Sequence, residues 1–422
     1  MTRIPPPLFF FLCVPCVFAP LREEIRIDFC YNNVAMQARV EKIVAGGAGL
    51  ARIDGKTIFI EGTAPGETVL CRITKEHRSW AEAELLEIIE SSPDRVQPDC
   101  AHYGICGGCN LQHIKYTAQI AAKTAILQDT FARIGGFNPP EPLVIPSKCT
   151  VTWLPWKYRN RMQFHIIRNH QTGVFWGLKA RKSADIVPIS DCPIADPGIQ
   201  ELFKGKIPVI PPEKDRFTVY ARNGLLLYEG GTQRGKTKIL DKELSLDAGV
   251  FFQSNGAMLE KMLVDLRTIA GKADRNLPMA DLYCGVGTFS AFLGELFPHI
   301  DLVEAEKTAL ALARENLIAL KSTAFYAQSS ENWAKTGLGH PYGFIIVDPP
   351  RQGLDPALAQ RLAKDGPPLL AYVSCDPATL ARDSAILRKG GYELSELRWY
   401  DFYPQTAHIE SLALFLRINT SY

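Results

Sequence analysis

Strand-like apolar runs alternate with helical runs in the C-terminal part of the chain, and this alternation restricts the fold more than any other feature. The predicted strands are 278–284, 300–305, 324–328, 343–350 and 369–375. Helical spacing lies between them, from Phe289 onward, at 308–320 and at 357–365. Each crossover between parallel strands places a helix on one face of the sheet, so this order predicts a parallel, doubly wound α/β domain, which we assign to residues 246–422.

Two further domains are expected, because 422 residues with 46% hydrophobic content are too many for one core. Residues 36–95 contain five short alternating strands separated by Gly-Gly, Asp-Gly and Pro-Gly turns, which predict a small β-barrel of the oligonucleotide-binding type. Such a barrel either binds RNA or only packs on its neighbour. Residues 96–245 start with a cysteine-rich segment and a helix, continue mainly as strands, and form the predicted central domain.

Residues 1–35 precede this ordered pattern, and we interpret them as a non-native or disordered extension. The apolar run at 5–20 is interrupted by prolines and has one Arg before it, so it is a poor membrane span and a weak signal peptide. No later segment resembles a membrane helix. Four of the eleven cysteines have metal-ligand character, which favours a reducing compartment, and we expect a cytoplasmic protein.

A glycine-rich loop, DLYCGVGTF, follows the first strand of the α/β domain. Gly285 and Gly287 lie where the backbone must turn tightly and approach a ligand. A dinucleotide-binding dehydrogenase would need a third glycine, where this chain has Ser290. Asp281 precedes the loop, and Glu304 ends the next strand, where a carboxylate can accept both ribose hydroxyls. This combination resembles the S-adenosylmethionine site of class I methyltransferases.

Asp348, Cys375 and Glu410 are the candidate reactive residues. Asp348 ends a buried strand, where such sheets bind substrates, although an Asp before Pro349 can also simply cap a turn. Cys375 follows the next buried strand and precedes a helix, whose N-terminus and a nearby basic group would lower the pKa of a nucleophilic thiol; a lone cysteine is otherwise a core residue. Glu410 opens the final apolar strand and is the candidate general base, with His408 as its rival.

Four cysteines have the character of metal ligands. Cys100, Cys106 and Cys109 lie close together around two glycines, whereas Cys192 stands alone in a later Asp-Cys-Pro segment. Clustered thiols suit a metal, but zinc sites made of paired C-x2-C motifs need a second close pair. On the residues alone, an iron–sulfur cluster, zinc and reduced thiols without a metal all stay open.

A basic segment between Lys157 and Lys182 is the candidate RNA-binding surface. It contains seven Lys or Arg and no Asp or Glu, and Arg159 and Arg161 are its candidate substrate contacts. Aromatic residues that offer stacking surfaces are interleaved with these cations, namely Trp156, Tyr158, Phe164, Phe175 and Trp176. Half-buried strands with solvated basic edges would produce the same pattern.

These motifs together resemble the uracil-5 RNA methyltransferase family, and the resemblance to its RumA-type 23S ribosomal RNA enzymes extends from about Met36 to the C-terminus. The matching motifs, in the family's order, are FFQSN, DLYCGVGTF, VDPPR, SCDPATLARD and HIESLALF. The resemblance implies a TRAM-type barrel and a Rossmann-like class I methyltransferase domain. Tyr283, Thr288 and Pro350 depart from the family pattern, which has Phe, Asn and Ala at these places in many relatives.

The resemblance also implies the chemistry. The thiol of Cys375 would add to carbon 6 of a uridine, carbon 5 would take the methyl group, and Glu410 would accept the proton that leaves carbon 5. Phe251 would help to place the flipped base. The residues implied to bind S-adenosylmethionine are Gln253, Tyr283, Glu304 and Asp348. The residues implied to hold a [4Fe-4S] cluster, for folding or RNA positioning, are Cys100, Cys106, Cys109 and Cys192.

RNA is the predicted partner, and 23S ribosomal RNA in particular, because tRNA uracil-5 enzymes generally lack both the barrel and the cysteine cluster. A cytosine-5 RNA methyltransferase would carry a second cysteine where this chain has Arg351, and a catalytically silent RNA-binding factor is the remaining alternative. The net charge is only +2, so RNA would be held by local basic patches. We expect a monomer that binds neither DNA nor a membrane.

Overall fold

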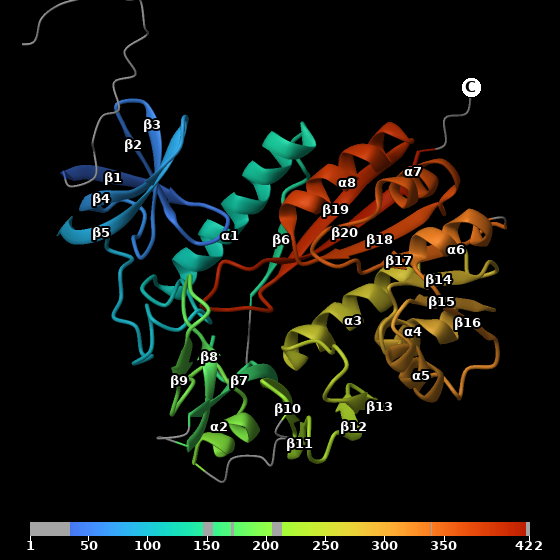
Figure 1. Ribbon diagram of the computed structural model, residues 1–422. Coiled ribbons are helices and arrows are strands. Elements are labelled where there is room, and N and C mark those ends of the chain that lie inside the picture. The colour runs from blue at the N-terminus through green and yellow to red at the C-terminus, as the bar shows by residue number, and fades with distance from the viewer. Residues whose placement is uncertain (1–33, 147–154, 170–172, 205–212, 339, 419–422) are drawn as a thin grey trace, which may run out of the picture.

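The computed structural model describes residues 34–146, 155–169, 173–204, 213–338 and 340–418. Figure 1 shows an N-terminal barrel, a central part rich in strands and a large α/β part. The extension predicted for residues 1–35 lies almost wholly outside the described residues. Among the described helices, none has the length and apolar character needed to cross a membrane.

The N-terminal part is a closed barrel of five strands, as the alternating sequence pattern predicts. In β1, Ala38 and Val40 are buried while the intervening Arg39 is exposed, because successive strand residues point to opposite faces. The strands pair in the order β1-β2-β3-β5-β4, with β3 and β5 parallel. Their bounds are Ala35–Ile43 (β1), Gly49–Ile53 (β2), Lys56–Ile60 (β3), Thr68–Glu76 (β4) and Trp80–Glu90 (β5).

The central part is an antiparallel sheet in the order β11-β10-β7-β8-β9, with α2 packed against β10. Its core is aromatic, since the ring of Phe164 lies 4.7 Å from that of Trp176 and 5.4 Å from that of Phe217. Phe164 and Trp176 are buried in this core, so the prediction that they stack on RNA is wrong. The bounds are Arg161–Asn169 (β7), Gly173–Lys179 (β8), Ile186–Pro188 (β9), Pro197–Lys204 (α2), Arg216–Arg222 (β10) and Leu225–Tyr228 (β11).

The C-terminal part contains an eight-stranded sheet in the order β16-β15-β14-β17-β18-β20-β19-β6. The strands from β14 to β18 are parallel, as predicted. The last strand, β20, runs antiparallel between β18 and β19, a direction that the sequence pattern did not predict. The reason is that the loop 401–409, without a crossover helix, joins β19 to β20 and reverses the chain. The bounds are Leu143–Ile145 (β6), Met279–Leu282 (β14), Ile300–Glu304 (β15), Thr323–Ala327 (β16), Phe344–Val347 (β17), Leu369–Ser374 (β18), Tyr392–Tyr400 (β19) and Glu410–Arg417 (β20).

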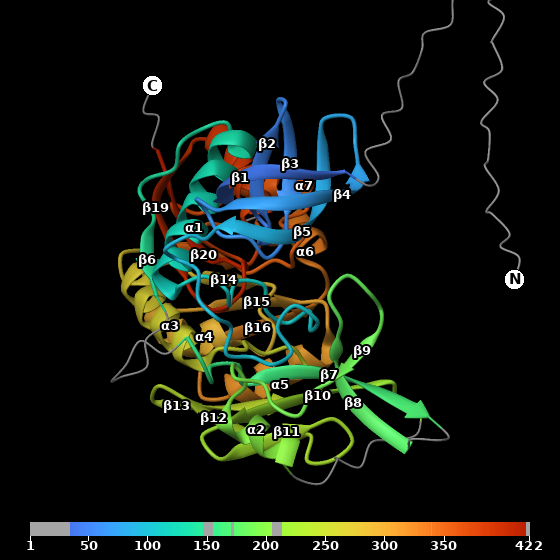
Figure 2. The same ribbon diagram turned by 90° about the vertical axis from the view of Figure 1, so that its left-hand side faces the viewer.

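Helices cover both faces of this sheet (Figures 1 and 2), which confirms the doubly wound arrangement. Met279 of β14 belongs to the core that includes α3, α4 and α5, whereas the next residue, Ala280, belongs to the core that includes α1, α6, α7 and α8. The pattern did not predict α3 or the short α6. The bounds are Tyr116–Thr130 (α1), Gly256–Ala270 (α3), Thr288–Leu293 (α4), Lys307–Asn316 (α5), Ser330–Gly337 (α6), Pro356–Asp365 (α7) and Pro377–Lys389 (α8).

Elements from the range 96–245 also contact the α/β part. Helix α1 continues into a π turn at Phe131–Gly135, which packs on α8, and β6 adds to the sheet edge beside β19. The hairpin of β12 (Arg234–Ile239) and β13 (Lys242–Asp247) contacts α5. Segments on both sides of the central sheet in the chain thus pack on the α/β part. This arrangement places the cysteine segment close to the C-terminal strands.

Candidate active site

A cavity of about 910 Å³ lies at the carboxyl ends of the parallel strands β14, β15, β17 and β18. The order of the sheet reverses at β14, which has β15 on one side and β17 on the other, and open α/β sheets bind their ligands at such a point. Seven of the residues singled out in the sequence line this one cavity, namely Phe251, Gln253, Tyr283, Glu304, Asp348, Cys375 and Glu410.

The glycine-rich loop forms one wall of the cavity. Gly285 and Gly287 have φ values of +54° and +78°, a left-handed conformation that favours glycine. The carboxylate of Glu304 accepts hydrogen bonds from the backbone N of Gly285 at 3.0 Å and of Glu306 at 2.8 Å. These bonds hold the strand-end carboxylate against the loop, at the edge of the cavity.

Asp281, the acid that precedes the loop, lies beneath it. Its side chain is fully buried beneath the loop and does not line the cavity. One carboxylate oxygen accepts from the N of Ser290 at 3.2 Å and from its Oγ at 2.6 Å, which braces the start of α4. Burial raises the pKa of Asp281 to about 7. The acid before the loop therefore supports the backbone of the site through one oxygen, while its other oxygen, Oδ1, is buried and has no hydrogen-bond partner among the described residues.

Gln253 and Tyr283 offer different groups to the cavity. The Oε1 atom of Gln253 is buried and has no hydrogen-bond partner among the described residues, as expected of a group that a ligand satisfies. The hydroxyl of Tyr283 already donates to Glu331 at 2.8 Å, so the ring is the part of Tyr283 that is available to a ligand in the cavity. Phe251 is 62% exposed at the cavity wall, and the guanidinium of Arg161 lies 5.4 Å from its ring centroid.

Cys375 and Glu410 lie side by side because of strand register. Ser374 of β18 pairs with Ser411 of the antiparallel β20, so the residue after Ser374 and the residue before Ser411 are neighbours at the same sheet edge. Glu410 is buried, whereas His408, the rival base, lies exposed at the cavity wall. The register therefore favours Glu410 over His408 as the group beside the thiol.

The pKa of the Cys375 thiol is raised to about 12, and the expectation that it is lowered is wrong. Burial is the largest cause, and the charges of Glu410 and Asp348 add to it, while Arg351 acts in the opposite direction. Burial and the charge of Asp348 likewise raise the pKa of Glu410 well above its usual value. The helix N-terminus does not compensate, because the first amides of α8 are already capped by Asp376.

Arg351 and Tyr403 also line the cavity, although the sequence analysis did not select them. Arg351 directly follows Pro350 in the motif VDPPR, so its place beside Asp348 could have been inferred from the motif. Tyr403 lies in the irregular loop 401–409, for which no periodic pattern predicts a position.

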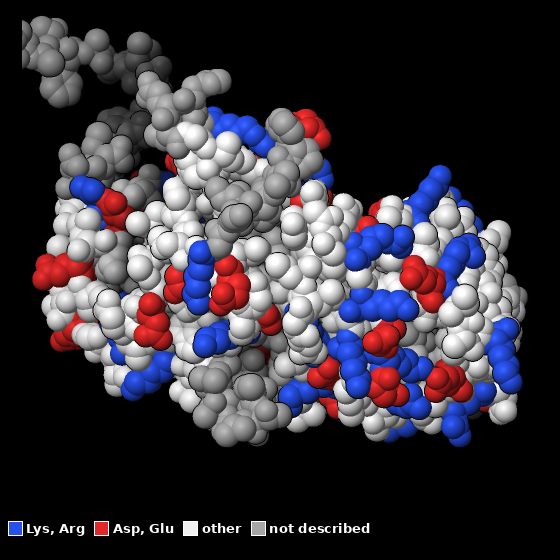
Figure 3. All heavy atoms as spheres, turned by 90° about the horizontal axis from the view of Figure 1, so that it is seen from below, with Lys and Arg blue, Asp and Glu red and all other residues white. Residues whose placement is uncertain are grey.

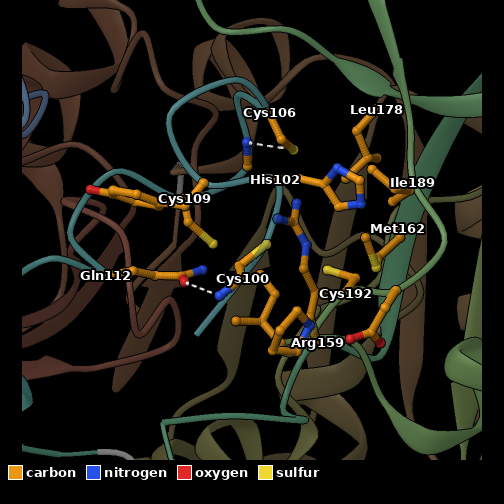
Figure 4. Close-up of a pocket in the computed structure, with 15 residues that line it drawn as sticks. Cys100, His102, Cys106, Cys109, Gln112, Arg159, Met162, Leu178, Ile189 and Cys192 are labelled. Carbon is orange, nitrogen blue, oxygen red and sulfur yellow. Dashed lines mark hydrogen bonds between the residues drawn. The ribbon is translucent and has the colours of Figure 1, made fainter. Parts of the chain in front are cut away.

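The four predicted metal ligands line a second, small pocket between the central sheet and the segment 100–109. Figure 4 shows Cys100, Cys109 and Cys192 around the side chain of Arg159, which extends into the same pocket. Cys106 lies at the far side, where its Sγ accepts from the N of Gly108 at 3.4 Å. Two backbone contacts assemble the pocket: Gly107 N bonds Lys179 O at 2.9 Å, and Arg159 N bonds Ile194 O at 2.8 Å.

All four of these thiols are free cysteines. Burial raises the pKa of Cys109 to about 11 and that of Cys192 to about 12, and the positive charge of Arg159 opposes both shifts. Within the part of the chain that the structure describes, no three His, Cys, Asp or Glu side chains have the arrangement that holds a metal ion. The pocket thus gathers the predicted ligands, and Arg159, predicted to contact substrate, lines it as well.

Surface charge is mixed on the face seen from below, where Lys and Arg are interspersed with Asp and Glu (Figure 3). Two cations of the basic segment are neutralised by the barrel, because Arg181 and Lys182 form ion pairs with Glu61 at 3.5 and 2.9 Å. On this face the basic residues therefore form local groups and not one continuous positive surface, in agreement with the small net charge.

The fold and the cavity define a class I methyltransferase that uses S-adenosylmethionine. Three family models match the chain: "TRAM domain" at residues 25–86, "Methyltransferase small domain" at 245–372 and "tRNA (Uracil-5-)-methyltransferase" at 339–418. Together they cover the barrel and most of the α/β part.

Relatives that match over nearly their full length identify the family of this chain more narrowly. It is 33% identical to an RNA methyltransferase of Treponema denticola, over 89% of this chain and 98% of that protein. It is 32% identical to the 23S rRNA (uracil(1939)-C(5))-methyltransferase RlmD of Edwardsiella ictaluri, over 88% of this chain and 93% of that protein. The chain belongs to the RNA uracil-5 methyltransferase family with a TRAM domain, and it is an S-adenosylmethionine-dependent RNA (uracil-5-)-methyltransferase.

A solved structure shares the whole architecture. The Pyrococcus abyssi tRNA (uracil-54, C5)-methyltransferase, in complex with S-adenosyl-L-homocysteine, matches with a TM-score of 0.68. The match covers 90% of this chain and 100% of that one at 22% identity, so it concerns the fold.

Substitution of Gly285 and of Gly287 should lower the free energy of unfolding by different amounts. A Cβ at Gly287 would lie 2.6 Å from Leu317 Cδ1 and 3.1 Å from Ala313 Cβ, whereas a Cβ at Gly285 meets nothing within 4 Å. We expect Gly285→Ala to lower the free energy of unfolding by about 1–2 kcal/mol through backbone strain, and Gly287→Ala by a further ~1–3 kcal/mol. Urea unfolding measures both, and calorimetry should show weaker S-adenosylhomocysteine binding for Gly287→Ala. Equal stability of the two variants would contradict this account.

Proposed function

We propose that this enzyme methylates carbon 5 of a uridine in 23S ribosomal RNA, with Cys375 as nucleophile and Glu410 as general base. The observation that carries the proposal is that the thiol of Cys375 and the carboxyl group of Glu410 lie at neighbouring strand ends in one cavity with the glycine-rich loop. The ribosomal substrate is supported by the relatives from Edwardsiella ictaluri and Alkalilimnicola ehrlichii, which are named 23S rRNA methyltransferases.

The reaction needs two groups on the protein side. Carbon 5 of uracil becomes nucleophilic when the sulfur of Cys375 adds to carbon 6, because the ring electrons then form an enolate. S-adenosylmethionine supplies the methyl group that carbon 5 takes. The carboxylate of Glu410 then removes the proton on carbon 5, the electrons of that C–H bond restore the double bond between carbons 5 and 6, and the C6–S bond breaks to release the thiolate.

The shifted pKa values fit these roles. A thiol with a pKa of about 12 is protonated at neutral pH, so the nucleophile needs a proton acceptor when it attacks. We assign Asp348, which lines the same cavity, as the acceptor of the thiol proton, because Glu410 must stay ionised to remove the proton on carbon 5. A carboxylate whose pKa is raised is a stronger base than one in water. Arg351 lowers the pKa of both Cys375 and Glu410 and thus favours their reactive, ionised forms.

S-adenosylmethionine fits the other half of the cavity. Glu304 presents a carboxylate at the end of β15 for the ribose, and the unpartnered Oε1 of Gln253 is an acceptor for a polar group of the ligand. We assign the ring of Tyr283 to the adenosine part and Asp348 to the side near the methyl group, since Asp348 lies on the β17 side toward Cys375.

We assign a [4Fe-4S] cluster to the cysteine pocket. Four free thiols from two distant segments line one pocket, although no three of them have a metal-holding arrangement among the described residues, and Arg159 supplies a positive charge that offsets thiolate charge. Because burial raises the pKa of Cys109 and of Cys192, binding of the cluster to their thiolates would release protons, and it would link the segment 100–109 to the central sheet. Methyl transfer from S-adenosylmethionine needs no redox step, so the expected role of the cluster is structural.

RNA would approach the cavity over the barrel and the central sheet. Phe251 is exposed at the cavity wall and is held by Arg161, so its ring is available to stack on a base that leaves its helix. Trp156 and Tyr158 pack against the core of the central sheet, so Phe175, which is only partly buried, remains as the further candidate stacking surface.

Substitution of the two reactive residues tests the chemistry. Cys375→Ala should lower turnover by at least about 1,000-fold and abolish the trapped adduct with 5-fluorouridine RNA, because no group then adds to carbon 6. Glu410→Gln should instead accumulate a methylated covalent RNA–protein complex, visible on denaturing gels. Turnover by Cys375→Ala would refute the assignment, and Glu410→Gln turning over without an adduct would remove Glu410 as the base.

The cluster is tested by metal analysis. Cys192→Ala should lose most of the iron and sulfide bound by anaerobically purified protein, together with its visible absorption, because one of four ligands is missing. Cys71→Ala, which removes a buried thiol of the barrel core, is the matched control and should keep both. Zinc in place of iron in the parent protein, or iron retained by Cys192→Ala, would contradict the proposal.

The substrate is tested with separate transcripts. Purified enzyme and tritiated S-adenosylmethionine should label unmodified 23S ribosomal RNA at carbon 5 of a uridine and should leave transfer RNA transcripts unlabelled. Mapping of the methyl group identifies the position. Labelling of transfer RNA alone would assign the enzyme to the other branch of the family without changing its reaction.

A further inference from the structure

The loop 401–409 leads directly into Glu410, the first residue of β20, which the strand register places beside Cys375. Tyr403 and His408 of the loop line the cavity, and Asp401 and Gln405 are buried. Gln405 has a φ of +67°, a left-handed conformation that costs free energy in a residue other than glycine. A loop with such backbone strain keeps its shape only if contacts from other elements hold it.

Those contacts come largely from the N-terminal half of the chain, and several of them start on α1. The side chain of Gln119 donates to Gln405 Oε1 at 2.9 Å and accepts from Gln405 N at 3.1 Å. The buried Lys123 donates to Asp401 Oδ1 at 2.6 Å and to Tyr403 O at 2.9 Å. The polar groups of the loop are thus satisfied by residues that precede it by almost three hundred positions.

Asn110 joins this loop to the barrel. Its Oδ1 accepts from Ala407 N at 2.9 Å, and its own N donates to Gln405 O at 3.1 Å. Its Nδ2 donates to Gly46 O at 2.7 Å in the turn between β1 and β2. The junction is tight, because a Cβ at Gly47 would lie 2.6 Å from Asn110 Nδ2 and 3.3 Å from Ala407 Cβ.

We propose that Asn110 is a positioning residue for methyl transfer: its side-chain amide holds the loop 401–409 so that Glu410 stays beside Cys375, and it connects that loop to the TRAM barrel. This inference rests on the proposed role of Glu410 as the base. Asn110 directly follows Cys109, so the cysteine pocket is one residue away from the contact with the loop.

The mechanism predicts which step slows when the contact between Asn110 and the loop 401–409 is lost. A displaced Glu410 takes the proton from carbon 5 more slowly, so the double bond between carbons 5 and 6 forms later and the C6–S bond to Cys375 persists. Methylation itself, which depends on the thiol and the cofactor, is affected less. The signature of a lost Asn110 is therefore a methylated covalent complex, together with a lower kcat at nearly constant KM.

Asn110 permits a sharper test than the buried pair of Lys123 and Asp401. Loss of Lys123 would leave a buried carboxylate without its cation and unfold the region, whereas Asn110 is only half-buried. Asn110→Ala removes both side-chain bonds. Asn110→Asp is the matched variant, because a carboxylate still accepts from Ala407 N but cannot donate to Gly46 O.

Hydrogen exchange of the full-length protein measures the position of the loop independently of catalysis. Asn110→Ala should exchange the amides of peptides covering 401–409 at least about tenfold faster than the parent protein, because the N–H of Ala407 loses its acceptor. Asn110→Asp should keep this protection and show faster exchange only in the turn of the barrel. The metal content of each variant is matched to the parent, so that loss of a bound metal is not the cause.

Kinetics then measure the consequence. We expect Asn110→Ala to lower kcat by about 10- to 100-fold, with the KM for RNA and for S-adenosylmethionine within about threefold, and to accumulate the methylated adduct. Asn110→Asp should retain most of the turnover. Unchanged loop exchange or unchanged kcat in Asn110→Ala, or equal defects in both variants, would overturn the proposal.

Glu410→Gln, measured in parallel, separates the two assignments. If Glu410→Gln is slow and Asn110→Ala is fast, only the role of Asn110 is wrong. If Glu410→Gln turns over at the parent rate, the proposed base is wrong and the inference about Asn110 falls with it.

Discussion

The pairing of β20 between β18 and β19 is the constraint on which the active site depends. Cys375 and Glu410 lie 35 positions apart in the chain, and only the register Ser374 to Ser411 brings them to one sheet edge. Side chains alternate along a strand, so a slip by one residue would turn Glu410 to the opposite face of the sheet. The adjacent parallel register of β17 and β18 places Asp348 at the same edge. Two strand pairings thus bring together the proposed nucleophile, the proposed base and the proposed cofactor-binding acid.

Burial shifts the pKa values of both Cys375 and Glu410. The same desolvation that raises the pKa of the Cys375 thiol raises the pKa of Glu410, so the proposed nucleophile is harder to ionise while the carboxylate of the proposed base becomes a stronger base. Asp281 shows a third outcome, since it is buried beneath the loop, is held by Ser290 and acts as a support for α4. These three buried groups therefore differ in role because they differ in what they face.

The N-terminal segments complete a site that the C-terminal domain does not form alone. Helix α1 and the residues after the cysteine segment satisfy the loop 401–409, and the barrel contacts the same junction through Gly46 and Asn110. The pocket of Cys100, Cys106, Cys109 and Cys192 lies next to this junction in the chain. A structural role of the cysteines agrees with this arrangement. A group that orders the segment 100–109 would also order Asn110, which directly follows the segment and bonds the loop 401–409.

Local patterns were sufficient to predict the five-stranded barrel, the helices on both faces of the sheet, and the cavity-lining residues that close strands or sit in the glycine-rich loop, such as Glu304 and Asp348. These features follow from periodicity and from the rule that parallel strands end at one edge. The antiparallel insertion of β20, the burial of Phe164 and Trp176, the raised pKa of Cys375 and the contacts of Asn110 were decided by the tertiary structure alone. The physical reason is that desolvation, charge–charge interactions and the pairing of distant strands depend on neighbours in space, which a linear pattern does not contain.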